Sequence, residues 1–471
     1  MKAADITLTA DDLAKLDAAA PRGGTAGPRY GEKALSMTKA LLWLAEDLRM
    51  EDNLASSLAL SRAHTGCVAV RIAPEARGRP QRTPNRLALE NAGELALSRQ
   101  LAARNVPLIF LGQSDTLSLA GLCRTHGCDV VIRNAADGSP LEVQCRERLE
   151  RELLEAGIRL QVVNGELIRH SGPEDDRPET PYLSDKDCVA PMRLDQDHPI
   201  ALLRAFLARL PESDYEAGMW LPAQDRSSSS QLSTHFAAGM LSSDRACLET
   251  MQAKARWLAR HPGQAATVAG KSFGAFHRRV NMRKGFLTSY SKRWSKYAQP
   301  LSMPPDSATR RTAALWRAGK TGIPMPDAAM RELAATGWIN FRLRQMVASY
   351  GIQLLGLHPD EVGVALAEMF DDYEPGITWL QVAINEGTLG EERGPRILNP
   401  VKQGRDLDPD ETYVRFWIPE LESVPRGLGH APWMASQNPL PPPLVDHRAA
   451  LREARAKWGE QKEKTPQLHL F

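Results

Sequence analysis

The sequence lacks long hydrophobic runs, since none of its apolar segments approaches the roughly 20 residues that a membrane-spanning helix requires. The N-terminus, MKAADITLTADDLAKLD, contains acidic residues and lacks the apolar block of a signal peptide. With 42% hydrophobic and 25% charged residues in 471, the composition is that of a globular protein with a large core. We therefore expect a cytoplasmic protein that does not enter a membrane.

Cysteines are few, and none of them forms a CxxC pair. The six are Cys67, Cys123, Cys128, Cys145, Cys188 and Cys247. Their scatter along a long chain argues for reduced thiols and against a disulfide framework. Cys123 and Cys128 could supply two ligands of a shared metal site, but ordinary buried thiols are the commoner case. We expect no metal site.

Acidic residues are absent from residue 250 to residue 305. The same interval contains eleven basic residues: Lys254, Arg256, Arg260, Lys271, Arg278, Arg279, Arg283, Lys284, Lys292, Arg293 and Lys296. Blocks of like charge are often interaction surfaces, and neutralised phosphates release their counterions. The alternative is a solvated helix face without a partner. The pattern favours a phosphate-bearing partner such as nucleic acid.

Apolar runs of β type occur five times before residue 170, at residues 40–47, 66–74, 106–113, 128–135 and 158–168. Amphipathic helical segments lie between them at 85–105 and 142–157. This alternation predicts an open parallel α/β sheet, covered on both faces because the strands are apolar throughout. From residue 199 onward the periodicity is helical. The fold class is therefore α/β plus all-α, with a Rossmann-like domain followed by an all-helical one.

Composition also suggests domain boundaries. We expect an N-terminal arm at 1–36, the α/β domain at 37–170, a linker rich in proline and acids at 171–198, and the helical domain at 199–434. Residues 435–471 combine a run of prolines with a charged helix and are expected to form a C-terminal tail.

Four consecutive serines precede an apolar segment in RSSSSQLSTHFAAGMLSSDR, residues 226–245. Hydroxyls, free backbone N–H groups and the positive end of a helix dipole together suit a phosphate. Ser233 is a candidate N-cap for a helix that begins near His235. The alternative is capping next to a flexible loop, without any ligand.

Further motifs carry a family resemblance. They are LLWLAEDLRMEDN at 41–53, TGIPMPDAAMRELAATGWINFRLR at 321–344, MFDDYEPGITW at 369–379 and ILNPVKQGRDLDPDETYVRFWIPELESVP at 397–425. Together with the serine segment they resemble the photolyase/cryptochrome flavoprotein family over about residues 38–434. DYEPGI and NPVKQ look like a divergent, photolyase-like bacterial branch of it.

The resemblance implies FAD, folded into the helical domain. The positions that match its cofactor contacts are Tyr215, Ser229, Ser230, Gln231, Leu232, Ser233, Arg344, Asp372, Glu374 and Thr378. The first six would lie near the diphosphate. Arg344 and Asp372 would form an ion pair beside the isoalloxazine, with Glu374 and Thr378 close to it. The residue types agree with this, because a buried arginine needs a carboxylate partner.

The substrate positions depart from the family pattern. In repairing members an acid and a tryptophan hold the damaged pyrimidine pair, and here Arg279 and Met282 match those places, followed by the retained Arg283. Phe341 replaces an asparagine and Gln345 a methionine. A methionine offers less stacking to a base than an aromatic ring, which contributes about 1–3 kcal/mol per base. All five residues are candidate substrate contacts.

Two functions follow from the resemblance. One is a light-driven, deoxyribodipyrimidine photo-lyase-type DNA repair enzyme, in which reduced FAD donates an electron to a flipped lesion. The other is a non-repairing, cryptochrome-like blue-light sensor or another FAD protein that binds a polyanion. Val382 favours the latter, because it stands where the first tryptophan of the electron-transfer chain is expected. A scaffold that has lost flavin is a third reading.

The expected DNA contacts are Arg278, Lys284, Lys292, Arg293 and Lys296. A second, antenna chromophore stays open, and the sequence assigns no residue to it. An iron–sulfur cluster of the four-cysteine type is not expected, because Cys247 is the only cysteine in the C-terminal half.

Overall fold

The computed structural model describes most of the chain. The described residues are 39–45, 47–62, 66–73, 76, 83–112, 118–135, 138, 140–163, 198–222, 228–297, 307–388 and 394–464. The predicted N-terminal arm and, up to residue 197, the predicted linker lie outside them. Among the described helices, none combines the length and apolar content needed to cross a bilayer.

The first part of the chain is a five-stranded parallel sheet in the order β3-β2-β1-β4-β5. Its strands are β1 (Ala40–Leu44), β2 (Cys67–Ile72), β3 (Leu108–Leu111), β4 (Val130–Asn134) and β5 (Arg159–Val163). All five predicted strands are present. Leu42 and Leu44 of β1 pack into one apolar cluster, and Leu41 and Trp43 into another on the opposite face. Both faces are thus buried, as the unalternating pattern predicts.

Four helices accompany the sheet: α2 (Leu54–Arg62), α3 (Pro84–Ala102), α4 (Leu119–His126) and α5 (Pro140–Glu155). The sequence predicts α3 and α5 but gives no clear signal for α2 and α4, which have only nine and eight residues. Cys123 of α4 and the nearby Cys128 are buried free thiols, and burial raises the pKa of Cys123 to about 12. They belong to the apolar core of the sheet domain.

The rest of the described chain is helical, which confirms the predicted class. Its α-helices are α6 (His198–Arg209), α7 (Tyr215–Gly218), α9 (Ser233–Ala237), α10 (Ser243–Arg260), α11 (Val268–Tyr297), α12 (Ser307–Arg317), α13 (Pro324–Thr336), α14 (Phe341–Ser349), α15 (Pro359–Met369), α16 (Pro375–Glu386), α17 (Pro400–Leu407), α18 (Thr412–Trp417) and α19 (His447–Lys464). A short π-helix, η6 (Tyr350–Leu354), extends α14.

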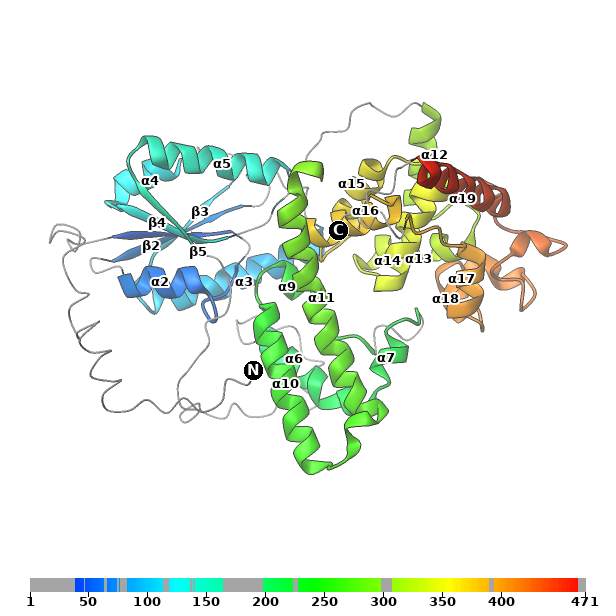
Figure 1. Ribbon diagram of the computed structural model, residues 1–471, viewed down its shortest axis with the longest axis horizontal. Helices are drawn as coiled ribbons and strands as arrows, with labels where there is room; N and C mark the ends of the chain where they lie inside the picture. The colour runs from blue at the N-terminus through cyan, green and yellow to red at the C-terminus, as the bar shows by residue number, and fades with distance from the viewer. Residues whose placement is uncertain are drawn as a thin grey trace.

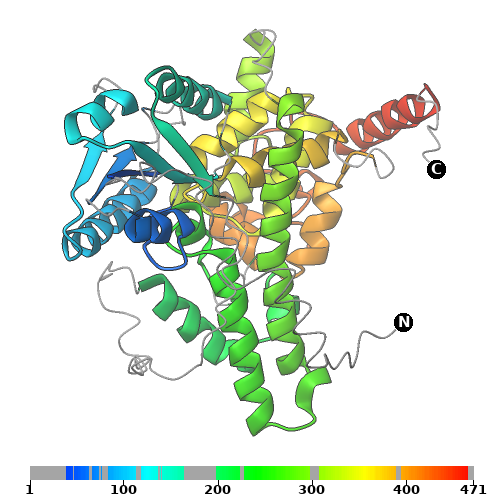
Figure 2. The same cartoon turned by 60° about the vertical axis from the view of Figure 1, so that its left-hand side comes forward.

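Helix α11 runs through the middle of the molecule, between the sheet domain and helices α13 to α18 (Figure 1). Helices α10 and α11 form an antiparallel hairpin that projects from the body, as the rotated view also shows (Figure 2). The segment expected as a C-terminal tail is packed onto the helical domain, because Leu440 and Leu451 belong to its main apolar core.

Candidate functional site

Arg344 and Asp372 form a buried ion pair. Arg344 Nη2 donates to Asp372 Oδ2 at 2.7 Å, and the two side chains are only 9% and 3% exposed. Arg344 Nε also donates to the carbonyl of Ile339 at 2.8 Å, and the guanidinium lies 4.0 Å from the centre of the Phe370 ring. The structure therefore brings together the two residues for which the sequence predicts an ion pair. Such a pair, short and charge-assisted, fixes the loop that carries Asp372 against helix α14.

Glu374 and Arg283 form a second pair. Arg283 Nε donates to Glu374 Oε2 at 2.9 Å, and Arg283 Nη1 donates to Ser243 Oγ at 2.8 Å. A third contact, from Arg283 Nη2 to the carbonyl of Phe236, measures 3.3 Å. The sequence assigns these two residues to different roles, one beside the cofactor and one beside the substrate. Here they neutralise each other and join helix α11 to the loop before α16.

The serine segment is arranged differently from the prediction at one residue. Helix α9 begins at Ser233, and its N-cap is Leu232, which has no polar side chain to cap with. The predicted N-cap role of Ser233 is therefore wrong. Ser233 Oγ instead accepts a hydrogen bond from Trp338 Nε1 at 3.2 Å. Because α9 has only five residues, its dipole is small. A phosphate at this place would therefore be bound by hydroxyls and backbone N–H groups.

A turn at residues 337–340 connects the serine segment to the carboxylate loop. Trp338 donates to Ser233, the carbonyl of Ile339 accepts from Arg344, and the carbonyl of Gly337 accepts from the Asp371 N–H at 2.8 Å. The phosphate candidates and the ion pair thus belong to one site. The sequence motif contains Trp338, but nothing in the local pattern shows that its partner lies 105 residues earlier.

Three buried polar atoms of this site have no hydrogen-bond partner among the described residues. They are Asp372 Oδ1, Asn340 Nδ2 and Ser229 Oγ. An unsatisfied buried polar group costs about 1–3 kcal/mol, so each of these atoms is available to a polar ligand or to a water molecule. They offer acceptors and donors on both sides of the turn, as a dinucleotide with a polar ring and a diphosphate requires. The residues present therefore fit FAD.

The remaining cofactor candidates differ in exposure. Tyr215 is buried, packs edge-on against Phe206 and Phe276, and has its pKa raised to about 12 by burial, so it stays neutral. Leu232 and Thr378 are buried, Ser230 is half-buried, and Gln231 is exposed with a left-handed φ of 52°.

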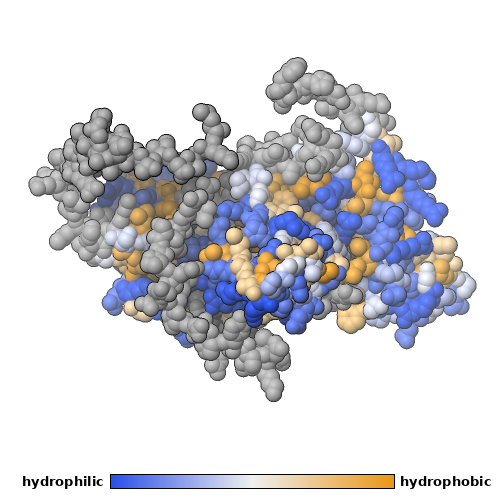
Figure 3. All heavy atoms as spheres, turned by 60° about the horizontal axis from the view of Figure 1, so that its bottom comes forward, coloured by the Kyte–Doolittle hydropathy of each residue, from blue (hydrophilic) through white to orange (hydrophobic). Residues whose placement is uncertain are grey.

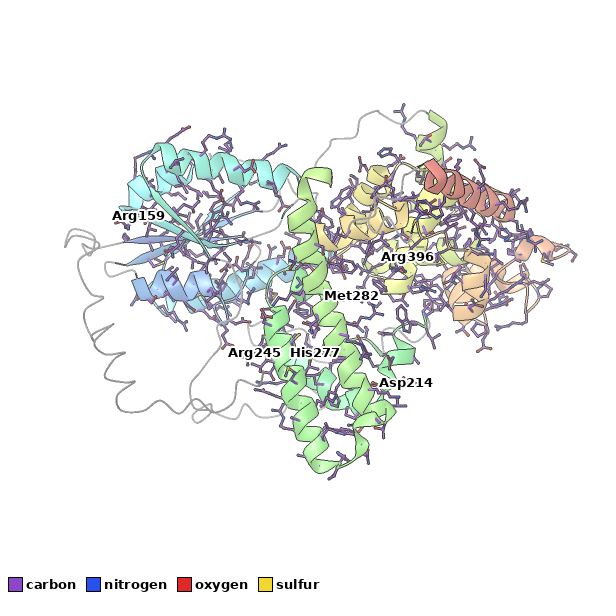
Figure 4. All side chains as sticks on the ribbon, viewed as in Figure 1. Arg159, Asp214, Arg245, His277, Met282 and Arg396 are labelled. Carbon is purple, nitrogen blue, oxygen red and sulfur yellow. The ribbon has the colours of Figure 1, made fainter. Side chains whose placement is uncertain are left out.

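Arg279 lies between two aromatic rings. Its guanidinium carbon is 4.5 Å from the centre of the Trp220 ring and 4.8 Å from that of Phe341. Its other side-chain contact is a weak one to Met282 Sδ, and burial lowers its pKa. No carboxylate among the described residues pairs with it. We call this group the cation shelf: Trp220, Phe341, Arg279 and Met282. Met282 lies on α11 and is 44% exposed (Figure 4).

Gln345 does not join the cation shelf. It is 1% exposed, and its Oε1 accepts a hydrogen bond from Arg396 Nη1 at 2.9 Å. The five candidate substrate contacts therefore separate into an outer set, the shelf residues Arg279, Met282 and Phe341, and an inner set, Arg283 and Gln345, which already have partners.

The basic block is partly neutralised in the fold. Arg278 pairs with Glu216 at 3.0 Å and Lys284 with Asp244 at 2.9 Å, and both acids lie outside the block. Lys292, Arg293 and Lys296 lie near the end of α11, where only the backbone is described. Arg256, Arg260 and Lys271 are exposed on the α10–α11 hairpin. Figure 3 views the molecule from the side of this hairpin and shows hydrophilic residues interleaved with smaller apolar ones. In the described ranges, no group of three or more potential metal ligands occurs.

Gly337 is the residue that lets the turn approach Asp371. Its φ is +68°, and a Cβ at this position would lie 2.2 Å from the Asp371 carboxylate. We expect Gly337→Ala to destabilise the protein by about 1–2 kcal/mol through its left-handed backbone and by about 1–3 kcal/mol more through the clash. Gly356→Ala is the matched control, since its φ is +67° with open space around it. Denaturant unfolding of both variants measures the difference, and equal losses would contradict the close approach.

Residues 276–460 match the family model described as the FAD binding domain of DNA photolyase, and residues 40–183 match the DNA photolyase model. The deoxyribodipyrimidine photo-lyase of Escherichia coli is 25% identical over 90% of this chain and 98% of its own. A cryptochrome DASH of Gloeobacter violaceus is 43% identical over about a quarter of each protein, 25% of this chain and 24% of the relative.

Solved structures show the same fold. A bacterial class III photolyase from Agrobacterium tumefaciens superposes with a TM-score of 0.68 at 21% identity, over 91% of this chain and 98% of that one. A cryptochrome from Synechocystis gives a TM-score of 0.70 at 20% identity, over 89% and 99% of the two chains.

Proposed function

We propose that this protein binds FAD in its helical domain and repairs pyrimidine lesions in DNA under blue light. The chain belongs to the DNA photolyase and cryptochrome family and contains that family's FAD-binding domain. The observation that carries the proposal is the buried Arg344–Asp372 pair, with one carboxylate oxygen free among the described residues and a hydrogen-bonded connection to the serine segment.

Within that site the residues have separate tasks. FAD, when bound, supplies the absorption of blue light and one-electron transfer. Ser229 and Ser230 offer hydroxyls to the diphosphate, while Asp372 and Asn340 offer an acceptor and a donor to polar groups of the cofactor. The Arg344 guanidinium, held in place by its own hydrogen bonds, favours added negative charge in a site that excludes water.

The cation shelf would meet the DNA. A guanidinium has donors only, so Arg279 recognises phosphate or carbonyl oxygens, whereas an acid at this place would recognise N–H groups. Trp220 and Phe341 offer ring faces on which a flipped base can stack. The exposed cations of the α10–α11 hairpin add a sequence-independent attraction to phosphates. The proposed lesion contact is thus opposite in polarity to the one that the family pattern implies.

One observation favours a second function, that of a light sensor. Gln345 and Arg283, both at positions where the family contacts substrate, are engaged inside the protein with Arg396 and Glu374. A site with fewer free substrate contacts suits a cryptochrome-like light sensor that binds DNA without repairing it.

The test is direct. The purified protein is examined by absorption spectroscopy after reconstitution with FAD, and the reduced holoprotein is then illuminated with an oligonucleotide that carries pyrimidine dimers. We expect a flavin spectrum and loss of lesions that depends on light. A flavin spectrum that changes in light while the lesion content stays constant would establish the sensor instead. A protein that takes up no flavin would overturn both functions.

Three finer expectations belong to this proposal. They are the DNA contacts at Arg278, Lys284, Lys292, Arg293 and Lys296, the lack of an iron–sulfur cluster, and a cytoplasmic location. An antenna chromophore stays unassigned.

A further inference from the structure

We propose that the first turn of α3, in the sheet domain, positions the flavin site of the helical domain. Thr83, Asn85 and Arg86 would act as positioning residues for the loop that carries Asp372 and Glu374. This inference rests on the proposed FAD site, and it assigns to the sheet domain a part in that site which is independent of any antenna chromophore.

Asp371 is the first anchor. Its Oδ1 accepts a hydrogen bond from Thr83 Oγ1, and its Oδ2 accepts one from Asn85 Nδ2 at 3.1 Å. Thr83 is also the N-cap of α3, since its Oγ1 accepts from the N–H of Arg86 at 3.2 Å. The carboxylate of Asp371 therefore lies at the positive end of a 19-residue helix, where a negative charge is stabilised. Its neighbour in the chain is Asp372, the partner of Arg344.

Arg86 is the second anchor, and it reaches two segments of the site at once. Its side chain is 3% exposed and forms an ion pair with Glu90 at 2.7 Å. Arg86 Nη1 donates to the carbonyl of Tyr373 at 2.5 Å, within the carboxylate loop. Arg86 Nη2 lies 3.5 Å from the carbonyl of Ala237, at the end of α9, within the serine segment. One buried guanidinium of the sheet domain thus spans the two stretches expected to hold the ring and the diphosphate.

The loop itself has every residue held from a different direction. Asp371 is held by α3, Asp372 by Arg344 of α14, and Glu374 by Arg283 of α11. The Tyr373 hydroxyl accepts from Trp379 Nε1 at 3.2 Å, while its carbonyl accepts from Arg86. Because adjacent residues share one backbone, a change at Asp371 or Tyr373 alters the direction of the Asp372 and Glu374 side chains.

Two variants and one control test this on the full-length protein. Arg86→Gln removes the bridging charge. Asn85→Asp acts at an exposed position and places a second negative charge beside Asp371. Arg99→Gln is the control, because Arg99 is an exposed cation on the same helix, away from the loop. FAD binding is measured by titration of the apoprotein, and the reduction potential and visible circular dichroism of bound flavin are recorded with thermal unfolding.

We expect both variants to weaken FAD binding, by roughly 10- to 100-fold for Arg86→Gln, because hydrogen bonds from a charged group are lost. Asn85→Asp should shift the flavin potential to a more negative value and change the dichroism, while its unfolding temperature stays that of the control.

Two results would overturn the inference. If wild-type protein binds FAD, and Asn85→Asp and Arg86→Gln match Arg99→Gln in affinity, potential and dichroism, then α3 does not position the site. If wild-type protein binds no FAD, the proposed function fails and the inference with it.

Discussion

Replacing Arg344 with methionine should yield a folded protein that binds FAD at least 100-fold more weakly than wild type. The substitution leaves the Asp372 carboxylate buried without its cation, and removing one partner of a buried pair costs about 3–5 kcal/mol. If that cost fell entirely on binding, it would correspond to a loss of about two to three and a half orders of magnitude in affinity. The measurement is an FAD titration of the apoprotein followed by flavin fluorescence.

A matched control and a double variant make this result specific. Arg342→Met changes the same residue type on the same helix, at a partly exposed position, and should bind FAD as wild type does. Arg344→Met combined with Asp372→Leu replaces both charges by apolar groups, which is often neutral for stability. We expect the double variant to recover thermal stability but not FAD binding. Recovery of both would mean that the pair serves only the fold.

Reversing the charge of Arg279 should weaken binding of an oligonucleotide with a pyrimidine dimer by roughly 10- to 100-fold, in line with about 1–3 kcal/mol for a direct arginine contact. The guanidinium has no carboxylate partner among the described residues, so Arg279→Glu removes a free cation and places an acid between Trp220 and Phe341. Arg279→Lys keeps the charge but loses the planar guanidinium, so its affinity for the oligonucleotide should lie between those of wild type and Arg279→Glu.

Arg256→Glu is the control for this experiment, because it makes the same change in net charge at an exposed position of α10. Fluorescence anisotropy at several salt concentrations compares the two. We expect Arg256→Glu to have a small effect that disappears at high salt, since exposed charges are screened. Equal losses for the two variants would show that Arg279 contributes only to the general field and makes no local contact.

The sheet was predictable because its signal is local. Each strand is an apolar run of a few residues, and burial on both faces leaves that run without alternation. The helices α2 and α4 were missed because a nine- or eight-residue helix covers barely two turns, too short for a clear period. Their helical state depends on packing against the sheet, which the sequence does not display.

The site was predictable in its charges but not in its pairings. An arginine on an apolar helix predicts a carboxylate partner, and Asp372 is that partner, 28 residues away. Glu374 and Arg283 were each assigned alone, because nothing local indicates a contact across 91 residues. The local sequence likewise predicts a cap at Ser233, because its actual partner, Trp338, is distant in sequence.

The contacts of α3 show most clearly that partners distant in sequence cannot be predicted from a local pattern. Pro84 at the first helical position follows Thr83, and in the structure Thr83 is the N-cap of α3. The same hydroxyl also binds Asp371, 288 residues later. The N-cap role alone explains a threonine at this position, so the local sequence does not indicate that its hydroxyl has a second partner.

Arg279 and Arg283 are four residues apart on α11, about 6 Å along the helix axis, and therefore share one face. The first lies between the aromatic rings of Trp220 and Phe341, while the second pairs with the half-buried Glu374. Helix α11 thus carries one guanidinium at the proposed DNA contact and a second one beside the proposed flavin site. Seating an oligonucleotide on the outer guanidinium should perturb the inner carboxylate, so that flavin fluorescence would itself report occupancy by DNA in the dark.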